Sequence, residues 1–491
     1  MAPRLSIGDM TGEARLAVGT LAGRAADLVS PTMRLGVTGL AHAGKTVFIT
    51  ALVHNLVHGG RLPLFRPYAA GRVASAALRP QPDDAVPRFA YEDHVRALVE
   101  DRVWPESTSR ISQLRLTIRY ESARYLSRRF GRGELNLDIV DYPGEWLLDL
   151  ALIGKDYAAW SGEAVSFARA ASRQALAAPF LDLVAGTNPD APEDETAARH
   201  LAAVFTDYLK AVRRDPASIA LLPPGRFILP GDLAGSPALT FAPLDLTGPI
   251  AAGSLAAMME RRYESYKSAV VKPFFRDHFA RLDRQIVLVD ALHALNAGPV
   301  AIAELETALA DILGAFRPGR GSWLSSLLLR RIDRILFAVT KADHLHHQDH
   351  GRLEAIMARL VQRATERARF AGAEVDVLAL AAVRATREGQ VIRGGERLPS
   401  IIGTPMEGET VNGEPFDGRT EIALFPGDLP QSPDAIFAAP AGELPRASDP
   451  AVRFVRFRPP PLERGAAGVT LSLPHIRLDR VLQFLLGDRL A

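Results

Sequence analysis

The feature that most constrains this chain is a glycine-rich octapeptide near its start, Gly39-Leu40-Ala41-His42-Ala43-Gly44-Lys45-Thr46. It fits the pattern G-x-x-x-x-G-K-[ST] at every specified position. An apolar stretch at 35–38 precedes it, and a segment with helical apolar spacing at 47–57 follows it. A strand–loop–helix unit of this kind wraps backbone N–H groups around an anion at the positive end of a helix. The pattern therefore predicts a phosphate-binding loop (P-loop) in an α/β fold with a mostly parallel sheet.

The residue types in this loop suit the phosphate chain of a nucleotide. Gly39 and Gly44 let the backbone approach the phosphates closely, and the Lys45 ammonium reaches the outer phosphates. Lys45 is one of only six lysines among the 58 basic residues, which indicates a need for a compact ammonium. The Thr46 hydroxyl is a ligand for Mg²⁺. The other residues expected to contact the nucleotide in this loop are His42, Ala43 and Val47.

A P-loop enzyme also needs an aspartate at the end of a buried strand to hold Mg²⁺, and two aspartates compete for this role. Asp141 ends the strand expected at 135–141 and opens the sequence Asp141-Tyr142-Pro143-Gly144. This is a D-x-x-G motif, whose glycine can donate its N–H to a γ-phosphate and act as a hinge. Asp290 ends the apolar run 285–290. We favour Asp141, which a GTPase requires, whereas an ATPase would use Asp290.

A third motif indicates which base the site reads. Thr340-Lys341-Ala342-Asp343 follows an apolar strand and matches [NT]-K-x-D. The Asp343 carboxylate can accept from both guanine N1–H and the exocyclic amino group, a donor pair that adenine lacks. The aliphatic part of Lys341 can lie along the base. The motif therefore predicts guanine rather than adenine.

Composition excludes several other classes of protein. The 491 residues suggest about three domains, or one domain with large insertions, on the usual size of about 150 residues. The net charge of +2 argues against nucleic acid as a partner. Cysteine is absent, which excludes disulfides and thiolate metal sites. We find no stretch of about 18 uncharged apolar residues, so we expect no transmembrane segment.

Periodicity places alternating strands and helices along the chain. Strands are expected at 35–38, 113–120, 135–141, 285–290, 334–340 and 374–382. Helices are expected at 9–30, 91–103, 162–178, 196–213, 254–281, 301–316, 351–370 and 476–487. Residues 61–90 are rich in proline and arginine and are interpreted as a loop.

The ordered motifs resemble a TRAFAC-type GTPase domain. Longer stretches resemble the bacterial YcjX-like family of stress-associated P-loop GTPases over nearly the whole chain. These are WPESTSR (104–110), VLVDALHALNAG (287–298), TKADHLHH (340–347), LAAVRATREG (380–389) and PHIRLDRVLQFLLGDRL (474–490).

The resemblance implies a G domain that binds GTP or GDP with Mg²⁺. Thr108 would be the switch I threonine that completes the Mg²⁺ shell, with Ser107 as its near rival. Asp141 and Gly144 would begin switch II. A backbone N–H in the segment 381–385, at Ala382 or Val383, would contact guanine O6.

One departure from the family pattern bears on catalysis. Glu145 stands where many GTPases have the glutamine that orients the attacking water. A carboxylate accepts from water but cannot donate to the γ-phosphate, so we expect slow intrinsic hydrolysis or help from another group. Arg102 and Arg110 flank the switch I candidate and could supply an arginine finger, although solvated side chains are the favoured interpretation for both. We expect Lys45, Thr108 and Glu145 to be the catalytic residues.

These expectations divide the chain into six parts. They are an N-terminal helix (1–33), the first half of the G domain (34–145), a helical insertion (146–280), the second half (281–388), a β-rich insertion (389–450), and a terminal strand and helix (451–491). The main hypothesis is a Mg²⁺-dependent GTPase switch in a bacterial stress response. The alternatives are a nucleotide-dependent scaffold with little turnover and an ATPase using Asp290. We expect a protein partner to bind at the insertion or the switches. We also expect a cytoplasmic location, with peripheral attachment to the inner membrane as an alternative.

Overall fold

The computed structural model describes most of the chain. The described residues are 31–40, 42–106, 110–122, 133–215, 222–314, 332–393, 395–411, 414–437, 454–462 and 472–491. The N-terminal helix expected at 9–30 and the switch I candidates Ser107 and Thr108 lie outside them.

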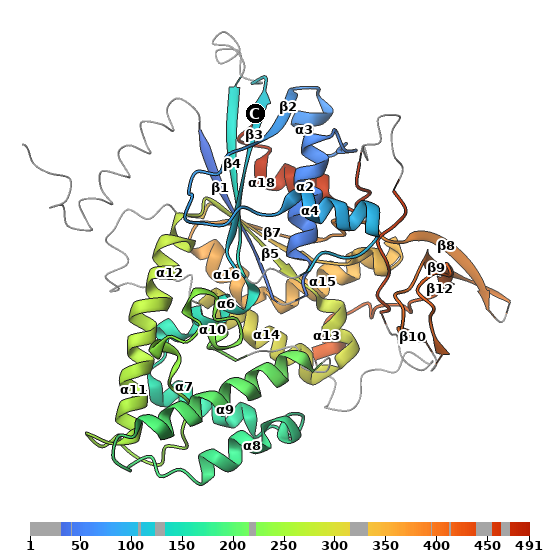
Figure 1. The fold of residues 1–491 in the computed structure, drawn as a ribbon. Coiled ribbons are helices and arrows are strands. Elements are labelled where there is room, and N and C mark those ends of the chain that lie inside the picture. The colour runs from blue at the N-terminus through green and yellow to red at the C-terminus, as the bar shows by residue number, and fades with distance from the viewer. Residues whose placement is uncertain are drawn as a thin grey trace, which may run out of the picture.

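A mixed, mostly parallel sheet forms the centre of the described molecule (Figure 1). Its strands are β1 (Thr32–Gly39), β2 (Val73–Arg79), β3 (Ser112–Tyr120), β4 (Gly133–Asp141), β5 (Arg284–Val289), β6 (Arg334–Val339) and β7 (Glu374–Ala379). Their order is β2-β3-β4-β1-β5-β6-β7. Strands β4, β1, β5, β6 and β7 run parallel, while β2 and β3 are antiparallel to their neighbours. The expected α/β class with a mostly parallel sheet is confirmed.

Strand β2 corrects one expectation, since residues 61–90 were interpreted as a loop. The segment also contains the short helix α3 (Arg66–Ala69). Strand β2 pairs with β3 at one edge of the sheet, with an irregularity between Val73 and Ser75. Of its side chains only Ala76 is buried, so the strand lacks the alternation of apolar and polar residues that identifies a half-buried strand. Backbone hydrogen bonds to β3 hold this strand in the sheet, and such bonds leave no pattern in the side chains that the sequence could show.

Helices cover both faces of the sheet. The P-loop helix α2 (Lys45–Val57) and the final helix α18 (Leu478–Leu486) share one apolar cluster with Leu336 and Ala338 of β6. The alternate β6 residues Ile335 and Phe337 belong to a second apolar cluster, on the opposite face of the sheet. That cluster includes residues of α13 (Ala291–Ala297), α14 (Pro299–Gly314), α15 (His350–Leu360) and α16 (Gln362–Phe370). A strand buried on both faces in this way reads as a continuous apolar run.

Between β4 and β5 the chain forms a mainly helical segment, drawn in green below the sheet in Figure 1. Its longer elements are α6 (Gly144–Leu148), η3 (Asp149–Gly154), α7 (Tyr157–Ala168), α8 (Gln174–Ala185), α9 (Glu195–Arg214), α10 (Gly225–Ile228), α11 (Leu255–Tyr266), η6 (Lys267–Val271) and α12 (Lys272–Asp277). It has its own apolar cluster, in which Trp160 stacks on Tyr263 at 5.0 Å between ring centroids.

Two helix expectations in this segment need correction. The helix expected at 162–178 is two helices, because α7 ends at Ala168 and α8 begins at Gln174. The helix expected at 254–281 is divided into α11, the π-helical turn η6 and α12. Apolar spacing persists across such breaks, so periodicity alone does not detect them.

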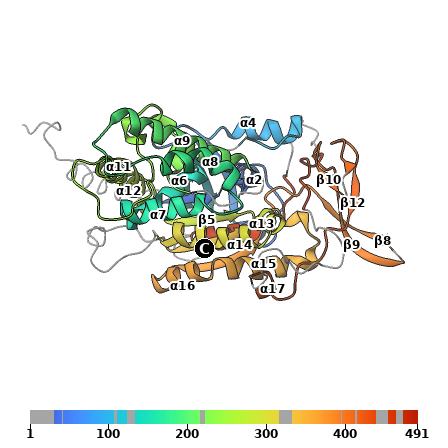
Figure 2. The same cartoon turned by 90° about the horizontal axis from the view of Figure 1, so that it is seen from below.

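The C-terminal part adds small strands at the far side of the sheet from α11 and α12 (Figures 1 and 2). Strands β8 (Arg387–Arg393), β9 (Glu396–Gly403) and β12 (Ile422–Leu424) form one antiparallel sheet, and β10 (Thr410–Val411) pairs with β11 (Glu414–Pro415). Three short helical elements remain. They are α4 (Tyr91–Arg96) and the π-helical turn η2 (Ala97–Asp101), which precede β3, and α17 (Asp434–Phe437). Where a terminal strand was expected near 452–457, the described residues contribute only an isolated bridge between Phe457 and Pro405. In the described part of the chain, no helix is both long enough and apolar enough to cross a membrane.

Candidate nucleotide-binding site

The P-loop connects the end of β1 to the start of α2. Gly44 has φ 81°, a left-handed conformation, and stands directly before the helix as its N-cap. The Nζ of Lys45 donates to the carbonyl oxygens of Gly39 and Leu40, at 2.9 and 3.2 Å. The ammonium therefore lies across the loop, at the position from which it can reach the outer phosphates of a bound nucleotide. His42 also has a positive φ of 62° and is exposed, while Ala43 is buried and Val47 lies in the first turn of α2.

Two of the motif glycines are needed because backbone segments meet there. A Cβ on Gly39 would lie 2.4 Å from the carbonyl oxygen of Leu288 in β5. A Cβ on Gly144 would lie 2.3 Å from the carbonyl oxygen of Gly39 itself. The D-x-x-G glycine therefore packs directly on the P-loop, which joins two motifs that are far apart in the sequence.

The candidate metal ligands Thr46 and Asp141 lie at the start of α2 and at the end of β4. Asp141 is the last residue of β4, is 1% exposed, and pairs in register with Val37 of β1. Thr46 is buried in the first turn of α2, and its Oγ1 donates to the carbonyl oxygen of Glu106 at 3.4 Å. A hydroxyl and a carboxylate are the hard oxygen donors that Mg²⁺ prefers, so this donor set fits the ion. Thr108 is outside the described residues, but the chain just before it lies against Thr46.

Asp290, the rival acid, has another task in the structure. Its Oδ1 accepts from the backbone N–H of His293 at 3.1 Å and caps α13, and its Oδ2 forms an ion pair with Lys341. Burial raises the pKa of Asp290, but the Lys341 ammonium and His293 together outweigh this effect and the pKa is lowered overall. Both carboxylate oxygens are thus engaged at the end of β5.

The base-reading motif follows β6 as expected. Thr340 donates its N–H to the carbonyl oxygen of Val289 at 2.9 Å, and Lys341 adopts a left-handed conformation with φ 61°. Asp343 is 4% exposed, and its Oδ2 accepts from the N–H of Ala385 at 2.8 Å. This hydrogen bond orients the carboxylate and ties the motif to the segment expected to contact guanine O6.

Within that segment the backbone N–H groups have different partners. Those of Ala381 and Arg384 donate to the carbonyl oxygens of Ile476 and Pro474, at 3.2 and 2.7 Å. Among the residues described, no protein acceptor pairs with the N–H groups of Ala382 and Val383. These two groups remain able to donate to a ligand.

Glu145 has a partner that the sequence does not reveal. Its side chain is 4% exposed and lies 2.8 Å from Nε of Arg213, near the C-terminal end of α9. The helix at 196–213 was expected from its spacing, but no pattern in the sequence links Arg213 to Glu145. Only the packing of α9 beside α6 brings them together.

Neither arginine that the sequence offered as a finger makes a contact with the P-loop in the described structure. Arg102 has φ 52° and donates from Nε and Nη2 to the carbonyl oxygen of Pro459, both at 3.2 Å. Arg110 is exposed, as a solvated side chain would be, whereas Arg102 is half-buried and paired with the C-terminal part of the chain.

Several cationic groups surround the loop. Burial lowers the pKa of Lys45, the nearby Asp141 and Glu145 carboxylates oppose this effect, and Arg213 adds to it. His42 is exposed but partly shielded from water by the surrounding protein, which lowers its pKa, and the charges of Lys341 and Arg213 lower it further. The charges of two distant segments, α9 and the turn after β6, therefore act at the P-loop, where phosphates would be bound.

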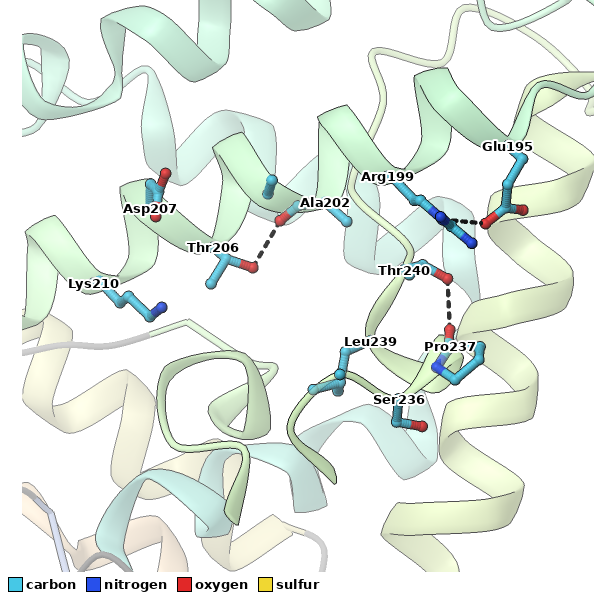
Figure 3. A pocket seen from close by; sticks show the side chains of 12 residues that line it. Glu195, Arg199, Ala202, Thr206, Asp207, Lys210, Ser236, Pro237, Leu239 and Thr240 are labelled. Atoms are coloured by element: carbon cyan, nitrogen blue, oxygen red, sulfur yellow. Dashed lines mark hydrogen bonds and ion pairs between the residues drawn. The ribbon is translucent and has the colours of Figure 1, made fainter. Parts of the chain in front are cut away.

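Two other features of the structure do not form part of this site. A hollow of about 540 Å³ lies between α9 and the loop 235–240, away from the P-loop (Figure 3). Some of its polar side chains are paired locally, since Arg199 bonds to Glu195 and Thr206 to the carbonyl oxygen of Ala202. The second is a group of ligand-type atoms from His346, His347 and Glu388 within 4.8 Å of one another. Its carboxylate already contacts His347 at 2.8 Å and the Arg384 cation at 3.7 Å.

Comparison with known proteins agrees with this architecture. The model of the YcjX-like family matches residues 33–490. A protein named Ras-like GTPase YcjX from Escherichia coli (strain K12) is 37% identical over 472 residues, covering 93% of this chain and 96% of the relative. A protein of the same name from Shewanella oneidensis (strain MR-1) is 34% identical over 482 residues, covering 93% and 94%. With its P-loop, D-x-x-G and T-K-x-D segments gathered at one edge of an α/β sheet, the chain belongs to the YcjX-like family.

Proposed function

We propose that this protein binds guanine nucleotides and hydrolyses GTP to GDP with Mg²⁺, acting as a nucleotide-dependent switch. The observation that carries the proposal is the meeting of three motifs at the carboxyl ends of parallel strands. The P-loop follows β1, the D-x-x-G motif follows β4 and the T-K-x-D motif follows β6. Ligands of open α/β sheets bind at this edge, where the strand order reverses.

The proposed roles follow from the contacts. Lys45 and the P-loop N–H groups would bind the phosphates, and Asp343, Ala382 and Val383 would bind the base. Thr46 and Asp141 would hold Mg²⁺, with Thr108 as the proposed third ligand. When bound, the ion neutralises charge on the β- and γ-phosphates. Gly144 would sense the γ-phosphate, because its close approach to Gly39 couples any movement of the P-loop to α6.

Base selectivity tests the nucleotide part of the proposal. Binding of fluorescent GDP and fluorescent ADP is measured with Mg²⁺ for the wild type, Asp343→Ala and Lys45→Ala. We expect the wild type to prefer GDP by about 100-fold or more, because a buried carboxylate discriminates strongly between donors and acceptors. Asp343→Ala loses this preference, and Lys45→Ala weakens the binding of both nucleotides.

Asp376→Ala is the matched control, because Asp376 is an exposed aspartate of β7, the strand after the base-reading motif. It leaves the preference unchanged. Equal binding of GDP and ADP by the wild type would contradict guanine specificity. Multiple-turnover hydrolysis of GTP then separates a switch from a scaffold that binds the nucleotide but barely hydrolyses it.

The proposal extends to the organisation of the chain. The six parts named from the sequence remain our proposed division, with segment 146–280 as the part that transmits the nucleotide state to a protein partner. Its support is the docking of this segment on α6. A role in a bacterial stress response rests on the family resemblance, and increased expression after heat shock is the measurement that tests it.

A further inference from the structure

An ion pair links one helix of the helical segment to the candidate nucleotide site. Arg213 is the second-to-last residue of the 20-residue helix α9 and contacts Glu145, the residue after the D-x-x-G glycine. The Arg213 side chain is 30% exposed, whereas that of Glu145 is 4% exposed. Arg213 therefore stands between the buried Glu145 carboxylate and solvent.

The hydrogen bonding of Arg213 is incomplete. Its Nε lies 2.8 Å from a Glu145 oxygen, yet this buried atom has no well-aligned hydrogen-bond acceptor among the described residues. A guanidinium has five N–H donors in a fixed fork, which suits phosphate oxygens as well as carboxylates. Arg213 therefore keeps donor capacity for a further anion.

The charges around Arg213 indicate where such an anion would lie. The Arg213 charge acts on both Lys45 and His42 in the P-loop. Two cations, Lys45 and Arg213, thus flank the same carboxylate, Glu145, which acts electrostatically on Lys45 as well. Such an arrangement suits the outer phosphates of a nucleotide, which bring several negative charges between the two cations.

We propose that Arg213 is the catalytic arginine of this GTPase, supplied in cis by the helical segment and held on Glu145 until the γ-phosphate is present. The inference rests on the proposed GTP hydrolysis. When GTP binds, the guanidinium exchanges the Glu145 carboxylate for a γ-phosphate oxygen. Glu145 is then released to accept a hydrogen bond from the attacking water.

The reaction balances without any further reactant. The water oxygen forms a bond to the γ-phosphorus, and the bond from that phosphorus to the β,γ-bridging oxygen breaks. GDP leaves with the electron pair of that bond, and the water protons end on phosphate and solvent. Arg213 exchanges no proton, because its guanidinium stays charged and stabilises the negative charge on the transferred group.

The test compares single-turnover GTP hydrolysis and GDP affinity in the full-length protein. Arg213→Ala is expected to slow hydrolysis by about 100-fold or more and to change GDP affinity by less than about threefold. Free guanidinium ion restores part of the lost rate. Arg214→Ala is the matched control, since Arg214 is the exposed neighbour on the same helix, and it hydrolyses GTP at the wild-type rate.

Glu145→Gln separates catalysis from a merely structural ion pair. Both Arg213→Ala and Glu145→Gln remove the ion pair, so a structural role predicts the same direction of change in the two variants. Our proposal predicts opposite directions, because glutamine releases Arg213 and can also donate to the γ-phosphate. Glu145→Gln therefore hydrolyses GTP at least as fast as the wild type.

The outcomes distinguish the two proposals. Wild-type hydrolysis with an equally active Arg213→Ala variant overturns the role of Arg213 alone. Parallel losses in Arg213→Ala and Glu145→Gln without guanidinium rescue also overturn it. A wild type that binds GTP but does not hydrolyse it overturns the proposed hydrolysis, and the role of Arg213 with it.

Discussion

At the scale of single residues, buried polar side chains join the nucleotide motifs to the helical segment. Asp149, 2% exposed, accepts from the hydroxyl of Tyr266 and from the N–H of Gly225, both at 2.6 Å. Trp146 donates its indole N–H to the carbonyl oxygen of Leu229 at 2.8 Å, and the Arg226 guanidinium lies 3.2 Å from the centre of its ring. These contacts fasten α6 and η3 to the helices that follow, so a displacement of Gly144 would be passed on to them.

Asp149 predicts a pH dependence of stability. Burial raises its pKa to about 6, against about 3.9 for an unfolded aspartate. Because the folded pKa is the higher one, this contribution to stability is complete below about pH 4 and is lost as the pH rises through about 6. Relative to Asp149→Asn, which cannot ionise, the wild type should lose about 2 kcal/mol of unfolding free energy between about pH 4.5 and 7.5. Urea unfolding at both pH values measures the difference.

The control for this prediction is Asp182→Asn, because Asp182 is exposed on α8. Its stability should follow that of the wild type at both pH values. If the difference in unfolding free energy between the wild type and Asp149→Asn were the same at both pH values, Asp149 would not titrate in this range.

At the scale of elements, α10 packs tightly against α6, the helix that begins at the D-x-x-G glycine. A Cβ on Gly225 would lie 1.8 Å from the carbonyl oxygen of Glu145. Glycine is therefore required by the neighbouring backbone, and the separation of α10 from α6 cannot increase without breaking the hydrogen bond from Gly225 to Asp149.

Gly225→Ala should destabilise the protein by about 2–3 kcal/mol, because the added methyl group forces the two backbones apart. The same substitution at Gly162, which lies inside α7 with open space around its Cβ position, should be stabilising by about 0.5–1 kcal/mol. Thermal unfolding of the two variants beside the wild type measures both changes. A Gly225→Ala variant as stable as Gly162→Ala would contradict the tight contact between α10 and α6.

At the scale of the whole molecule, the C-terminal helix closes one face of the sheet. The α18 residues Leu478, Val481, Leu482, Leu485 and Leu486 are all 0% exposed. Arg284 at the start of β5 anchors the end of this helix. It is buried, contacts Asp488 at 2.6 Å and Asp333 at 3.0 Å, and donates to the carbonyl oxygen of Leu485. The apolar face of α18 is thus part of the core.

Arg284→Met should therefore destabilise the fold by about 2–3 kcal/mol, less than a fully buried pair would cost because both aspartates are partly exposed. Arg119→Met removes the cross-strand pair with Glu134, whose side chains are 50% and 38% exposed, and should cost no more than about 1 kcal/mol. Urea unfolding compares the two. If the two variants lost the same unfolding free energy, the Arg284 contacts would contribute no more to stability than a surface ion pair does.

The sequence by itself determined the local chemistry of this protein. The P-loop, the D-x-x-G motif and the T-K-x-D motif are short segments whose residue types and neighbouring apolar runs indicate strand, turn and helix directly. The sheet class and six of its strands follow from periodicity. Strands β3 and β4 show the alternation of a half-buried strand, and β5, β6 and β7 show the apolar run of a strand buried on both faces, with a short apolar stretch at β1.

Only the tertiary structure decided which distant residues share the site. The edge strand β2 is held by backbone pairing, which leaves no side-chain pattern. The pairs of Glu145 with Arg213 and of Asp290 with Lys341 join segments far apart in the chain. A charge on an amphipathic helix looks the same in sequence whether it meets solvent or a buried carboxylate. The physical reason is that side-chain periodicity records which face is buried, whereas the partner on that face is set by how the elements pack.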